Sequence, residues 1–423
     1  MSSLTVIGAG YVGLTTAVCL AYLGHDVRCT DVDTDKVEAL QGGKVPIVEE
    51  GLEPLLREGL DSGRLRFGSD NVAAVRDAEF VFLCVPTPQS ESGRADMSYI
   101  NAAASEIGAH LRSGAIVVNK STVPVGSTKV VEGALGRSDV AVVSNPEFLR
   151  EGSAVHDFLH PDRIVIGADD EAIAVKVAGL FLKTRAPVVL TDPASAETIK
   201  YASNAYLATK ISFVNAIAAL CEAAGADVRA VTAGMGLDPR IGAEFLRPGP
   251  GWGGSCFPKD THALVRIAED VGYDFKLLKG AIEANEEQYG LVVSKVRRLA
   301  GGSLAGKTVA LWGLTFKAGT DDVRSSPAVD IAHRILAEGA AVQAFDPTVS
   351  APLDGIDVRP TAVAACVGAD VLLVATEWSE FRSEDFDAVG EAMAQRCVVD
   401  GRNLLERDML VRAGFAYEGI GLA

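Results

Sequence analysis

A predicted strand, a Gly8-x-Gly10-x-x-Gly13 sequence and a helical pattern follow one another at the start of the chain, and this order restricts the fold more than any other feature. The first glycine permits a tight turn, the second lets a pyrophosphate approach the backbone, and the third allows the helix to pack closely against the strand. The helix N-terminus then offers unpaired N–H groups to the anion. The segment therefore predicts a dinucleotide-binding α/β domain.

The residue at the end of the next predicted strand, Asp31, indicates which dinucleotide is bound. An acidic residue at this place holds the ribose hydroxyls, and it repels the 2′-phosphate of NADP, so NAD is favoured. Lys36 follows shortly after, and its ammonium would weaken this preference by contacting a phosphate. The alternative interpretation is that the glycines form an ordinary turn and that Asp31 caps a helix.

Short β-branched runs alternate with amphipathic helical segments in the first and last thirds of the chain, which is typical of parallel sheets covered by helices. The strands expected in the first third are Leu4–Ile7, Val27–Thr30, Phe80–Val85, Ile116–Asn119 and Val140–Ser144. The strands expected in the last third are Thr308–Trp312, Val342–Phe345, Val371–Ala375 and Cys397–Val399. Between them, residues 195–224 contain neither Pro nor Gly and predict one long helix.

We therefore expect an α/β fold in which two Rossmann-like α/β domains are joined by a long central helix and a small all-α region. The N-terminal NAD-binding Rossmann domain is expected over 1–192, and the central helical domain over 193–300. The C-terminal α/β domain is expected over 301–423.

The composition excludes several classes of protein. A formal charge of −17 argues against a sequence-independent nucleic-acid binder, which needs a basic face. The seven cysteines are dispersed and odd in number, so neither a disulfide framework nor a zinc site is expected. No Lys or Arg precedes Arg28, so the apolar residues 4–24 lack the charged start of a secretory signal. We expect a cytoplasmic protein with no metal, no nucleic-acid partner and no membrane span.

The glycine- and proline-rich loop from Arg247 to Asp260 contains the strongest candidate for a nucleophile, Cys256. A loop of this composition lets the backbone lie against a ligand. The ammonium of Lys259, three residues further on, favours the thiolate, which is the reactive form of cysteine. The alternative is an inert buried cysteine, which is the commonest fate of a lone one.

Other candidates lie in pairs with helical spacing or at the end of a predicted strand. Lys200 and Asn204 project from one face of the long helix, where a cation and an amide are suited to holding an oxyanion. Glu147 and Glu151 have the same spacing if their segment is helical, and a carboxylate there would activate a water molecule. Thr122 ends a predicted strand, where ligands bind in α/β sheets. The alternatives are a solvated helix face for the first pair and a helix N-terminal charge for the second.

Ordered motifs along essentially the whole chain resemble the UDP-glucose/GDP-mannose dehydrogenase family. They are GAGYVGL at 8–14, CVPTP at 84–88, KSTVPVGS at 120–127, NPEFLREGSA at 145–154, ETIKYASNAYLATKISFVNA at 197–216, GGSCFPKD at 253–260, GLTFKAGTDDVRSSPA at 313–328 and DGRN at 400–403. So many motifs in one order make the resemblance highly specific.

The resemblance implies a four-electron oxidation, in which a sugar alcohol becomes an acid through a thiohemiacetal and a thioester on the cysteine. The implied catalytic residues are Cys256, Lys200, Asn204, Asp260, Thr122 and Glu151. The implied NAD-binding residues are Gly8, Gly10, Tyr11, Val12, Gly13, Asp31, Lys36, Pro86, Thr87, Thr122, Glu151 and Arg324. The implied UDP-sugar-binding residues are Glu147, Phe148, Leu149, Lys200, Asn204, Arg240, Gly253, Phe316, Lys317 and Arg402. It also implies a homodimer formed through the central helical domain, in which Arg240 reaches the substrate of the neighbouring subunit.

Alternatives stay open for the substrate and for the class of protein. Ser255, Lys259 and Asp260 resemble the UDP-glucose branch rather than the UDP-N-acetylmannosamine branch, while the GDP-mannose branch has a similar cysteine loop and is the second candidate. The segment Pro248–Trp252 departs from the Phe-Gly-Phe-like form of both branches. A non-catalytic NAD-binding scaffold, or a two-electron hydroxyacid dehydrogenase, would not need Cys256.

The first prediction concerns the cofactor. Because the Asp31 carboxylate and a 2′-phosphate would occupy the same small volume, kcat/KM is expected to be much higher with NAD than with NADP. Initial rates with each cofactor measure the ratio. Equal values for the two cofactors would remove Asp31 from the ribose site.

Overall fold

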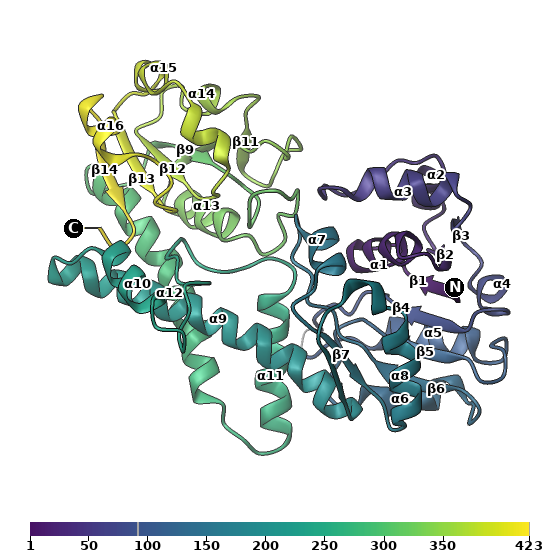
Figure 1. The fold of residues 1–423 in the computed structure, drawn as a ribbon. Helices are drawn as coiled ribbons and strands as arrows, with labels where there is room; N and C mark the ends of the chain where they lie inside the picture. Colours follow the sequence, from purple (N-terminus) through teal and green to yellow (C-terminus); the bar gives the residue numbers. More distant parts are fainter. Residues whose placement is uncertain (91–92, 423) are drawn as a thin grey trace. The chain divides into compact units, whose positions relative to one another are not determined.

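The computed structural model describes residues 1–90 and 93–422, which form two compact units (Figure 1). The first unit comprises residues 1–203 and 262–271, and the second comprises residues 204–261 and 272–423. The long helix α9 (Pro193–Ala224) contributes its first part to the first unit and the rest to the second.

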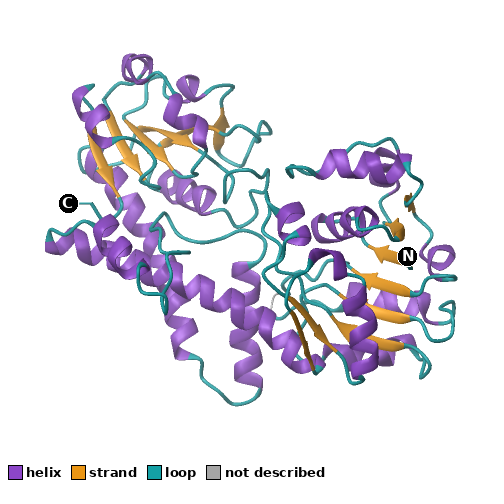
Figure 2. Ribbon diagram, in the orientation of Figure 1, coloured by secondary structure: helices purple, strands orange, loops and turns teal. Residues whose placement is uncertain are grey.

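The first unit contains an eight-stranded sheet in the order β3-β2-β1-β4-β5-β6-β7-β8 (Figure 2). Its strands are β1 (Ser3–Ile7), β2 (Asp26–Thr30), β3 (Leu65–Gly68), β4 (Phe80–Leu83), β5 (Ile116–Asn119), β6 (Ala141–Ser144), β7 (Ile164–Gly167) and β8 (Val188–Thr191). All neighbours are parallel except β6 and β7, which meet antiparallel at Ser144 and Gly167. The strand order reverses direction at the β1/β4 boundary, which is where α/β sheets bind ligands.

Helices cover both faces of this sheet, because side chains along each strand alternate between the two faces. In β4, Phe80 and Phe82 join one apolar core, while Val81 and Leu83 join the other. The first core is shared with α1 (Tyr11–Tyr22), α2 (Thr34–Gln41), α3 (Leu52–Asp61), α7 (Ala154–Leu159) and α8 (Glu171–Gly179). The second core is shared with α4 (Asn71–Val75), α5 (Ser98–Gly108) and α6 (Ser127–Leu135). A short 3₁₀ helix, η1, spans Leu182–Thr184.

The second unit contains a six-stranded parallel sheet in the order β11-β10-β9-β12-β13-β14. Its strands are β9 (Thr308–Trp312), β10 (Ala341–Phe345), β11 (Ile356–Val358), β12 (Val371–Val374), β13 (Cys397–Asp400) and β14 (Ala416–Gly419). One face packs against α12 (Lys276–Leu299) and α13 (Pro327–Ala337), and the other against α14 (Ala362–Ala365), α15 (Phe386–Ala392) and α16 (Arg407–Arg412). The remaining helices are α10 (Val228–Gly236), α11 (Phe257–Asp270), which begins here and ends in the first unit, and the 3₁₀ helix η2 (Ser379–Ser383).

The predicted fold class is confirmed: each of the two units is α/β, and the strand order in each sheet changes direction once. Strand and helix bounds agree with expectation to within a few residues. For example, Phe80–Val85 was expected as a strand, and β4 ends at Leu83. The chain leaves the sheet there because Val85 precedes Pro86, and prolines cannot continue a ladder. The division at 192/193 and 300/301 stays a prediction.

Helix α9 is long and apolar enough to cross a membrane by length and composition alone, which the sequence reasoning did not anticipate. It nevertheless buries polar side chains that bond to other parts of the protein, among them Glu197, Lys200 and Ser212. Core helices of folded domains pass the same length and composition test, so this alone is weak evidence for a span.

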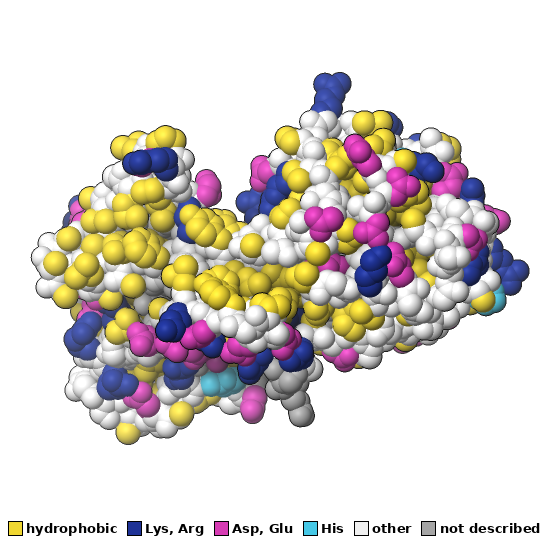
Figure 3. Space-filling model, turned by 90° about the horizontal axis from the view of Figure 1, so that it is seen from below, with side chains coloured by type: hydrophobic (Ala, Val, Ile, Leu, Met, Phe, Trp, Pro, Cys, Tyr) yellow, Lys and Arg dark blue, Asp and Glu magenta, His cyan; other side chains and the backbone are white. Residues whose placement is uncertain are grey.

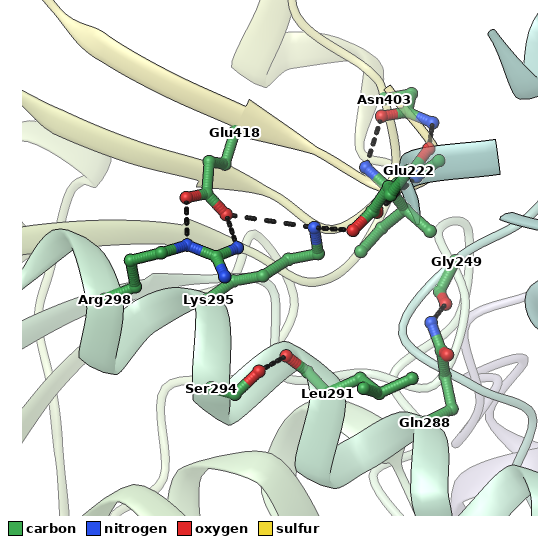
Figure 4. Close-up of polar contacts among 11 residues, drawn as sticks. Glu222, Gly249, Gln288, Leu291, Ser294, Lys295, Arg298, Asn403 and Glu418 are labelled. Carbon is green, nitrogen blue, oxygen red and sulfur yellow. Dashed lines mark hydrogen bonds and ion pairs between the residues drawn. The ribbon is translucent and has the colours of Figure 1, made fainter. Parts of the chain in front are cut away.

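An ion cluster attaches the C-terminal strand to the helices of the second unit (Figure 4). The buried ammonium of Lys295, on α12, lies 2.7 Å from Glu222 of α9 and 3.8 Å from Glu418 of β14. The guanidinium of Arg298 also binds Glu418, and Glu222 accepts a hydrogen bond of 2.7 Å from the N–H of Gly421. These contacts place α9, α12 and the end of the chain side by side.

Candidate functional site

The glycine-rich turn after β1 has the geometry that a dinucleotide requires. Gly8 has φ of 97°, and a Cβ there would lie 2.6 Å from the carbonyl oxygen of Cys84. A Cβ at Gly13 would lie 1.8 Å from the Gly8 oxygen, so only glycine allows α1 to approach this closely. Beside Gly10 there is open space within 4 Å, and no side chain caps the N-terminus of α1. The residues therefore fit an anionic pyrophosphate at this helix end.

Asp31 lies beside this turn at the end of β2, as expected. Its Oδ2 atom accepts hydrogen bonds of 2.8 Å from the N–H of Ala9 and 3.2 Å from Lys36. Burial alone would raise the pKa of Asp31, but the N–H groups of Asp33 and Ala9 together with Lys36 lower it below its ordinary value. Asp31 is therefore ionised at neutral pH. Lys36, expected as a possible phosphate contact, is instead paired with Asp31.

The other expected cofactor residues of the first unit follow the same edge of the sheet. Tyr11 and Val12 form the first turn of α1, and the Tyr11 hydroxyl binds the buried carboxylate of Glu49. The N–H of Gly152 donates to both Tyr11 and Glu49, at 2.7 and 2.8 Å. The exposed Pro86 and the buried Thr87 come directly after β4. These four residues therefore surround the β1/β4 boundary.

A buried ion pair joins α9 to the loop after β6. The Lys200 ammonium donates a hydrogen bond of 2.8 Å to Glu147, and their side chains are only 4% and 5% exposed. Burial opposes the charge on Glu147, but Lys200 and the N–H of Leu149 stabilise it and lower the pKa of this carboxyl below its ordinary value. Phe148 lies beside the pair, with its ring centroid 5.6 Å from the Lys200 nitrogen. Lys200 is thus a buried cation rather than part of a solvated helix face.

The expectation of helical spacing between Glu147 and Glu151 is wrong. Residues 145–153 are a loop and turn that lead into α7. Proline at 146 and the bond from the Leu149 N–H to the Glu147 carboxylate, 2.7 Å long, are incompatible with a continuous helix through this segment. Glu151 is half-buried in the turn, next to the Gly152 amide that binds Tyr11.

Thr122 lies in the half-buried loop after β5, as expected. The buried Glu197 of α9 holds this loop: it accepts hydrogen bonds of 2.6 Å from the N–H of Gly126 and 3.0 Å from that of Thr128. The sequence reasoning assigned no role to Glu197, because an acidic residue near a helix start is usually solvated.

Lys120, in the same motif as Thr122, is a further functional candidate that was not expected from the sequence. Its side chain is buried at the carboxyl end of β5 and donates a hydrogen bond of 3.1 Å to Asn145. Burial lowers the pKa of Lys120, against the attraction of Cys84 and Glu147. Two lysines, Lys120 and Lys200, therefore act electrostatically on Glu147. Only the position of Lys120 directly after a buried strand could have indicated this.

In the second unit, Cys256 immediately precedes α11. It therefore lies at the N-terminus of this helix, the end toward which the first backbone N–H groups point. The N–H of Asp260 donates to the Cys256 carbonyl at 2.9 Å. The Ser255 hydroxyl lies 3.6 Å from the Cys256 sulfur. Cys256 is partly exposed, unlike most of the other cysteines.

The fully buried carboxylate of Asp260 connects two further candidates. Its Oδ2 accepts a hydrogen bond of 2.6 Å from Asn204, and its Oδ1 binds the Lys259 ammonium at 2.6 Å. Lys259, expected to favour a thiolate directly, is thus paired with Asp260. Asn204 and Asp260 form a buried donor–acceptor pair from α9 and α11.

Four of the expected sugar-nucleotide residues lie at or beside the carboxyl edge of the second sheet. Phe316 and Lys317 follow β9, and Arg402 follows β13. Arg402 donates to the carbonyl oxygens of Ala375 at 2.8 Å and Phe316 at 3.3 Å. Gly253 lies against the same region, because a Cβ on it would be 2.0 Å from the carbonyl oxygen of Ser325.

Two expected arginines project from the surface of their units. The Arg240 side chain is 88% exposed and makes a two-pronged ion pair with Asp238. Arg324 is also exposed and binds Asp322 in the same way.

Chemically, the first unit offers an anion site with an adjacent carboxylate and a buried ammonium paired with a carboxylate. The second unit offers a thiol at a helix start, a buried amide–carboxylate pair and a guanidinium at a sheet edge. Such a set can bind a dinucleotide and a second phosphorylated ligand, and it provides a nucleophile together with groups that hold oxygen anions.

Comparison with protein-family models matches the domains of the UDP-glucose/GDP-mannose dehydrogenase family in order along the chain. The NAD binding domain matches residues 2–184, the central domain residues 194–287, and the UDP binding domain residues 310–407.

Individual relatives match over nearly their full length. A UDP-glucose 6-dehydrogenase of Pseudomonas aeruginosa is 45% identical, with 99% of this chain and 97% of the relative covered. The UDP-glucose 6-dehydrogenase TuaD of Bacillus subtilis is 44% identical, with 100% of this chain and 93% of the relative covered. Among solved structures, a UDP-glucose dehydrogenase from the hyperthermophilic archaeon Pyrobaculum islandicum is 38% identical with a TM-score of 0.91, and the match covers 100% of this chain and 98% of that one.

The second prediction concerns the buried Glu147–Lys200 pair. Because the pKa of Glu147 is lowered in the folded protein, the pair contributes stability above the ordinary carboxyl pKa and loses it as pH falls through the lowered value. Glu147→Gln leaves the Lys200 charge buried without its partner, so it should lower the free energy of unfolding at pH 7 by about 3 kcal/mol. Urea unfolding at pH 7 and at pH 4 should show the difference from the parent shrinking in acid.

The matched control is Glu53→Gln, which removes an exposed ion pair with Arg57. This variant should change the free energy of unfolding by less than about 1 kcal/mol at either pH. Equal losses for the two variants would show that the Glu147–Lys200 pair has no special weight.

Proposed function

Because the chain belongs to the UDP-glucose/GDP-mannose dehydrogenase family, we propose that it oxidises UDP-glucose to UDP-glucuronate with NAD, in two successive two-electron steps. The observation that carries the four-electron chemistry is an accessible cysteine at the start of α11, four residues before a buried aspartate that binds Asn204. An enzyme that only converts an alcohol to a carbonyl compound has no use for this nucleophile. GDP-mannose is the second candidate substrate, because that branch has a similar cysteine loop.

NAD would be held by the glycine turn, by Asp31 and by the residues after β4. Gly10 leaves the space for the pyrophosphate and the Asp31 carboxylate accepts ribose hydroxyls. Tyr11, Val12, Pro86, Thr87, Thr122, Glu151 and Arg324 are proposed to complete the site. Bound NAD supplies the hydride acceptor for each oxidation.

The covalent chemistry belongs to Cys256. Its thiolate forms a bond to the aldehyde carbon, and the carbonyl electron pair moves to oxygen, which takes a proton to give a thiohemiacetal. Loss of a hydride and a proton from that adduct leaves a thioester. Water then adds to the thioester carbon, the carbon–sulfur bond breaks, and the thiolate leaves with its electron pair.

The proposed partners of Cys256 manage charge at oxygen and at water. Lys200 and Asn204 donate hydrogen bonds to the developing oxyanion. Asp260 and Glu151, with Thr122, orient the attacking water and accept its proton. The hydrogen bond from Asn204 to Asp260 supports this division, because it holds the amide donor and the carboxylate acceptor next to each other.

The nucleotide-sugar is proposed to lie at the carboxyl edge of the second sheet. Phe316, Lys317, Gly253 and Arg402 are its proposed contacts there, with Arg402 meeting the uridine nucleotide. Glu147, Phe148 and Leu149 contact the sugar. Arg402 is supported by its bonds to two backbone carbonyls, which hold its guanidinium at the sheet edge.

The third prediction tests this function by counting NADH. Limiting UDP-glucose should yield two NADH per sugar. Cys256→Ser should lower steady-state turnover by several orders of magnitude, since a serine alkoxide forms with difficulty at neutral pH and an ester is hydrolysed more slowly than a thioester. Intact-protein mass spectrometry of the serine variant after incubation with NAD and UDP-glucose should reveal a covalent sugar adduct or an aldehyde-level product.

The control is Cys397→Ser, which alters the other partly exposed cysteine and should leave turnover unchanged. One NADH per sugar would eliminate the four-electron mechanism. Faster turnover of GDP-mannose than of UDP-glucose would select the other branch of the family.

We also propose that the protein is a cytoplasmic homodimer formed through the central helical segment. Hydrophobic side chains gather on the surface drawn in Figure 3. On α9, Tyr206, Phe213 and Leu220 recur every seven residues and are 63%, 51% and 61% exposed, which is typical of a helix face awaiting a partner. The exposed Arg240 is then available to reach the substrate of a neighbouring subunit.

The fourth prediction follows from this helix face. Phe213→Glu should convert a dimer to a monomer in analytical ultracentrifugation, because it places a charge in the centre of the apolar stripe. The control is Val367→Glu, which introduces the same charge at a valine just after α14 that is about as exposed as Phe213. It should leave the sedimenting mass of the protein unchanged. A parent protein that already sediments as a monomer would refute the proposal.

A further inference from the structure

The loop that carries Cys256 is held by side-chain amides from two helices. At Gly249, the backbone N–H donates a hydrogen bond of 2.9 Å to the Asn215 side chain of α9. The Gly249 carbonyl oxygen accepts one of 2.7 Å from Gln288 of α12 (Figure 4). Both backbone polar groups of this glycine are therefore satisfied by amide side chains.

A third amide side chain, that of Asn285, holds Trp252 in the same way. The N–H of Trp252 donates to Oδ1 of Asn285 at 2.8 Å, and Nδ2 of Asn285 donates back to the Trp252 carbonyl oxygen at 2.9 Å. The Tyr289 hydroxyl donates to the same carbonyl at 2.9 Å, and the indole N–H of Trp252 binds the Ser212 hydroxyl at 2.9 Å. Asn285 thus pairs with both backbone polar groups of Trp252, as a residue of a neighbouring antiparallel strand would.

These bonds are made by buried side chains of the second unit. Asn285 and Gln288 are each 3% exposed. A buried hydrogen bond that loses its partner costs more than one at the surface, because water cannot replace it. The Asn285 amide both accepts and donates at this site, whereas an ionised carboxylate of the same shape would face the Trp252 carbonyl with an acceptor oxygen.

Close backbone contacts hold the loop from other sides. A Cβ at Gly251 would lie 2.4 Å from the Tyr289 ring, and one at Gly254 would lie 2.8 Å from the Phe316 ring. The Trp252 indole meets the ring of Phe257 edge-on, with centroids 6.4 Å apart. Phe257 directly follows Cys256 in the chain. A shift of Trp252 would therefore displace Cys256 through the contact between the Trp252 and Phe257 rings.

We propose that Asn285 and Gln288 are positioning residues that set the place and reactivity of Cys256 through the backbone of Trp252 and Gly249. The proposal rests on the nucleophilic role of Cys256. It also gives Trp252 a place, where the loop departs from the form that the family resemblance implies. The indole is buried and contacts Ser212 of α9 and Phe257 of α11. A displacement of about 1 Å at a reacting group can cost about a hundred-fold in rate.

The fifth prediction compares Asn285→Asp with the parent. The variant keeps the shape and loses the donor to the Trp252 carbonyl. We expect kcat with UDP-glucose to fall ten- to a hundred-fold while KM for NAD changes less than two-fold. Alkylation of each cysteine by iodoacetamide, resolved by peptide mass spectrometry across pH 6–9, should show at least a three-fold change in the rate at Cys256 and none at Cys397.

A general loss of folding would change the rate at Cys397 as well, so equal changes at both cysteines would overturn the proposal. A folded variant whose kcat and Cys256 alkylation stay within two-fold of the parent would also overturn it. The alkylation measurement needs no substrate, so it separates this inference from the proposed function: a parent that produces no NADH from UDP-glucose refutes the function alone.

Gln288→Glu provides a second variant if Asn285→Asp does not fold. Glu has nearly the same shape as Gln, so this substitution removes the donor to the Gly249 carbonyl without a change of volume. It should also change the Cys256 rate at least three-fold, and an unchanged rate would refute the proposal. Ser294→Ala is the matched control, because Ser294 lies on the same helix and its hydroxyl donates within that helix, to the Leu291 carbonyl at 2.7 Å (Figure 4). It should behave like the parent in every measurement.

Discussion

The need to satisfy polar groups buried along helix α9 determines where the loops of both units lie. In chain order, the buried polar side chains of this helix are Glu197, Lys200, Asn204, Ser212 and Asn215. Each one binds a segment that carries a candidate site residue or lies next to one: Gly126 and Thr128, then Glu147, Asp260, Trp252 and Gly249. A buried polar group without a partner costs on the order of 1–3 kcal/mol, so loops that leave these groups unpaired are disfavoured.

This constraint explains why a mostly apolar helix contains so many polar residues. The apolar residues pack the helix into the cores, and the polar ones specify which loop lies against it and in which register. A catalytic site needs its groups fixed to within a fraction of an ångström, and rigid helices do this better than the loops themselves. The helix thus works as a scaffold in each unit that it enters.

The features that depend on neighbouring residues could be predicted from the sequence. Gly8, Gly10, Gly13 and Asp31 lie where the pattern requires, because a tight turn between a strand and a helix is a local structure. The strand ends that carry Thr122, Phe316 and Arg402 follow from the alternation of strands and helices.

What depends on the direction in which a side chain turns in the folded protein could not be predicted. The partners of Lys36 and Lys259 are carboxylates within five residues, yet only the folded backbone decides that the ammonium groups reach these carboxylates. Asn285 and Gln288 bind a loop more than thirty residues away in sequence, and helix amides are most often solvated. Glu197 could not be predicted because nothing in its local sequence distinguishes a buried charge from an exposed one, and the only local sign for Lys120 is its position directly after a buried strand.

In each sheet an aspartate directly follows the second strand in chain order: Asp31 follows β2, and Asp346 follows β10. The two carboxylates differ in how many further hydrogen bonds they can accept. Asp31 receives three hydrogen bonds, from Ala9, Asp33 and Lys36. Asp346, at the end of β10, receives six: from the N–H groups of Leu314, Thr315 and Thr348, the hydroxyls of Thr315 and Thr348, and the indole of Trp378. Its lone pairs are saturated, so it has none left for a ribose. A protein engineer who wished to install a second dinucleotide site there would have to strip donors from Asp346 before grafting any glycine motif.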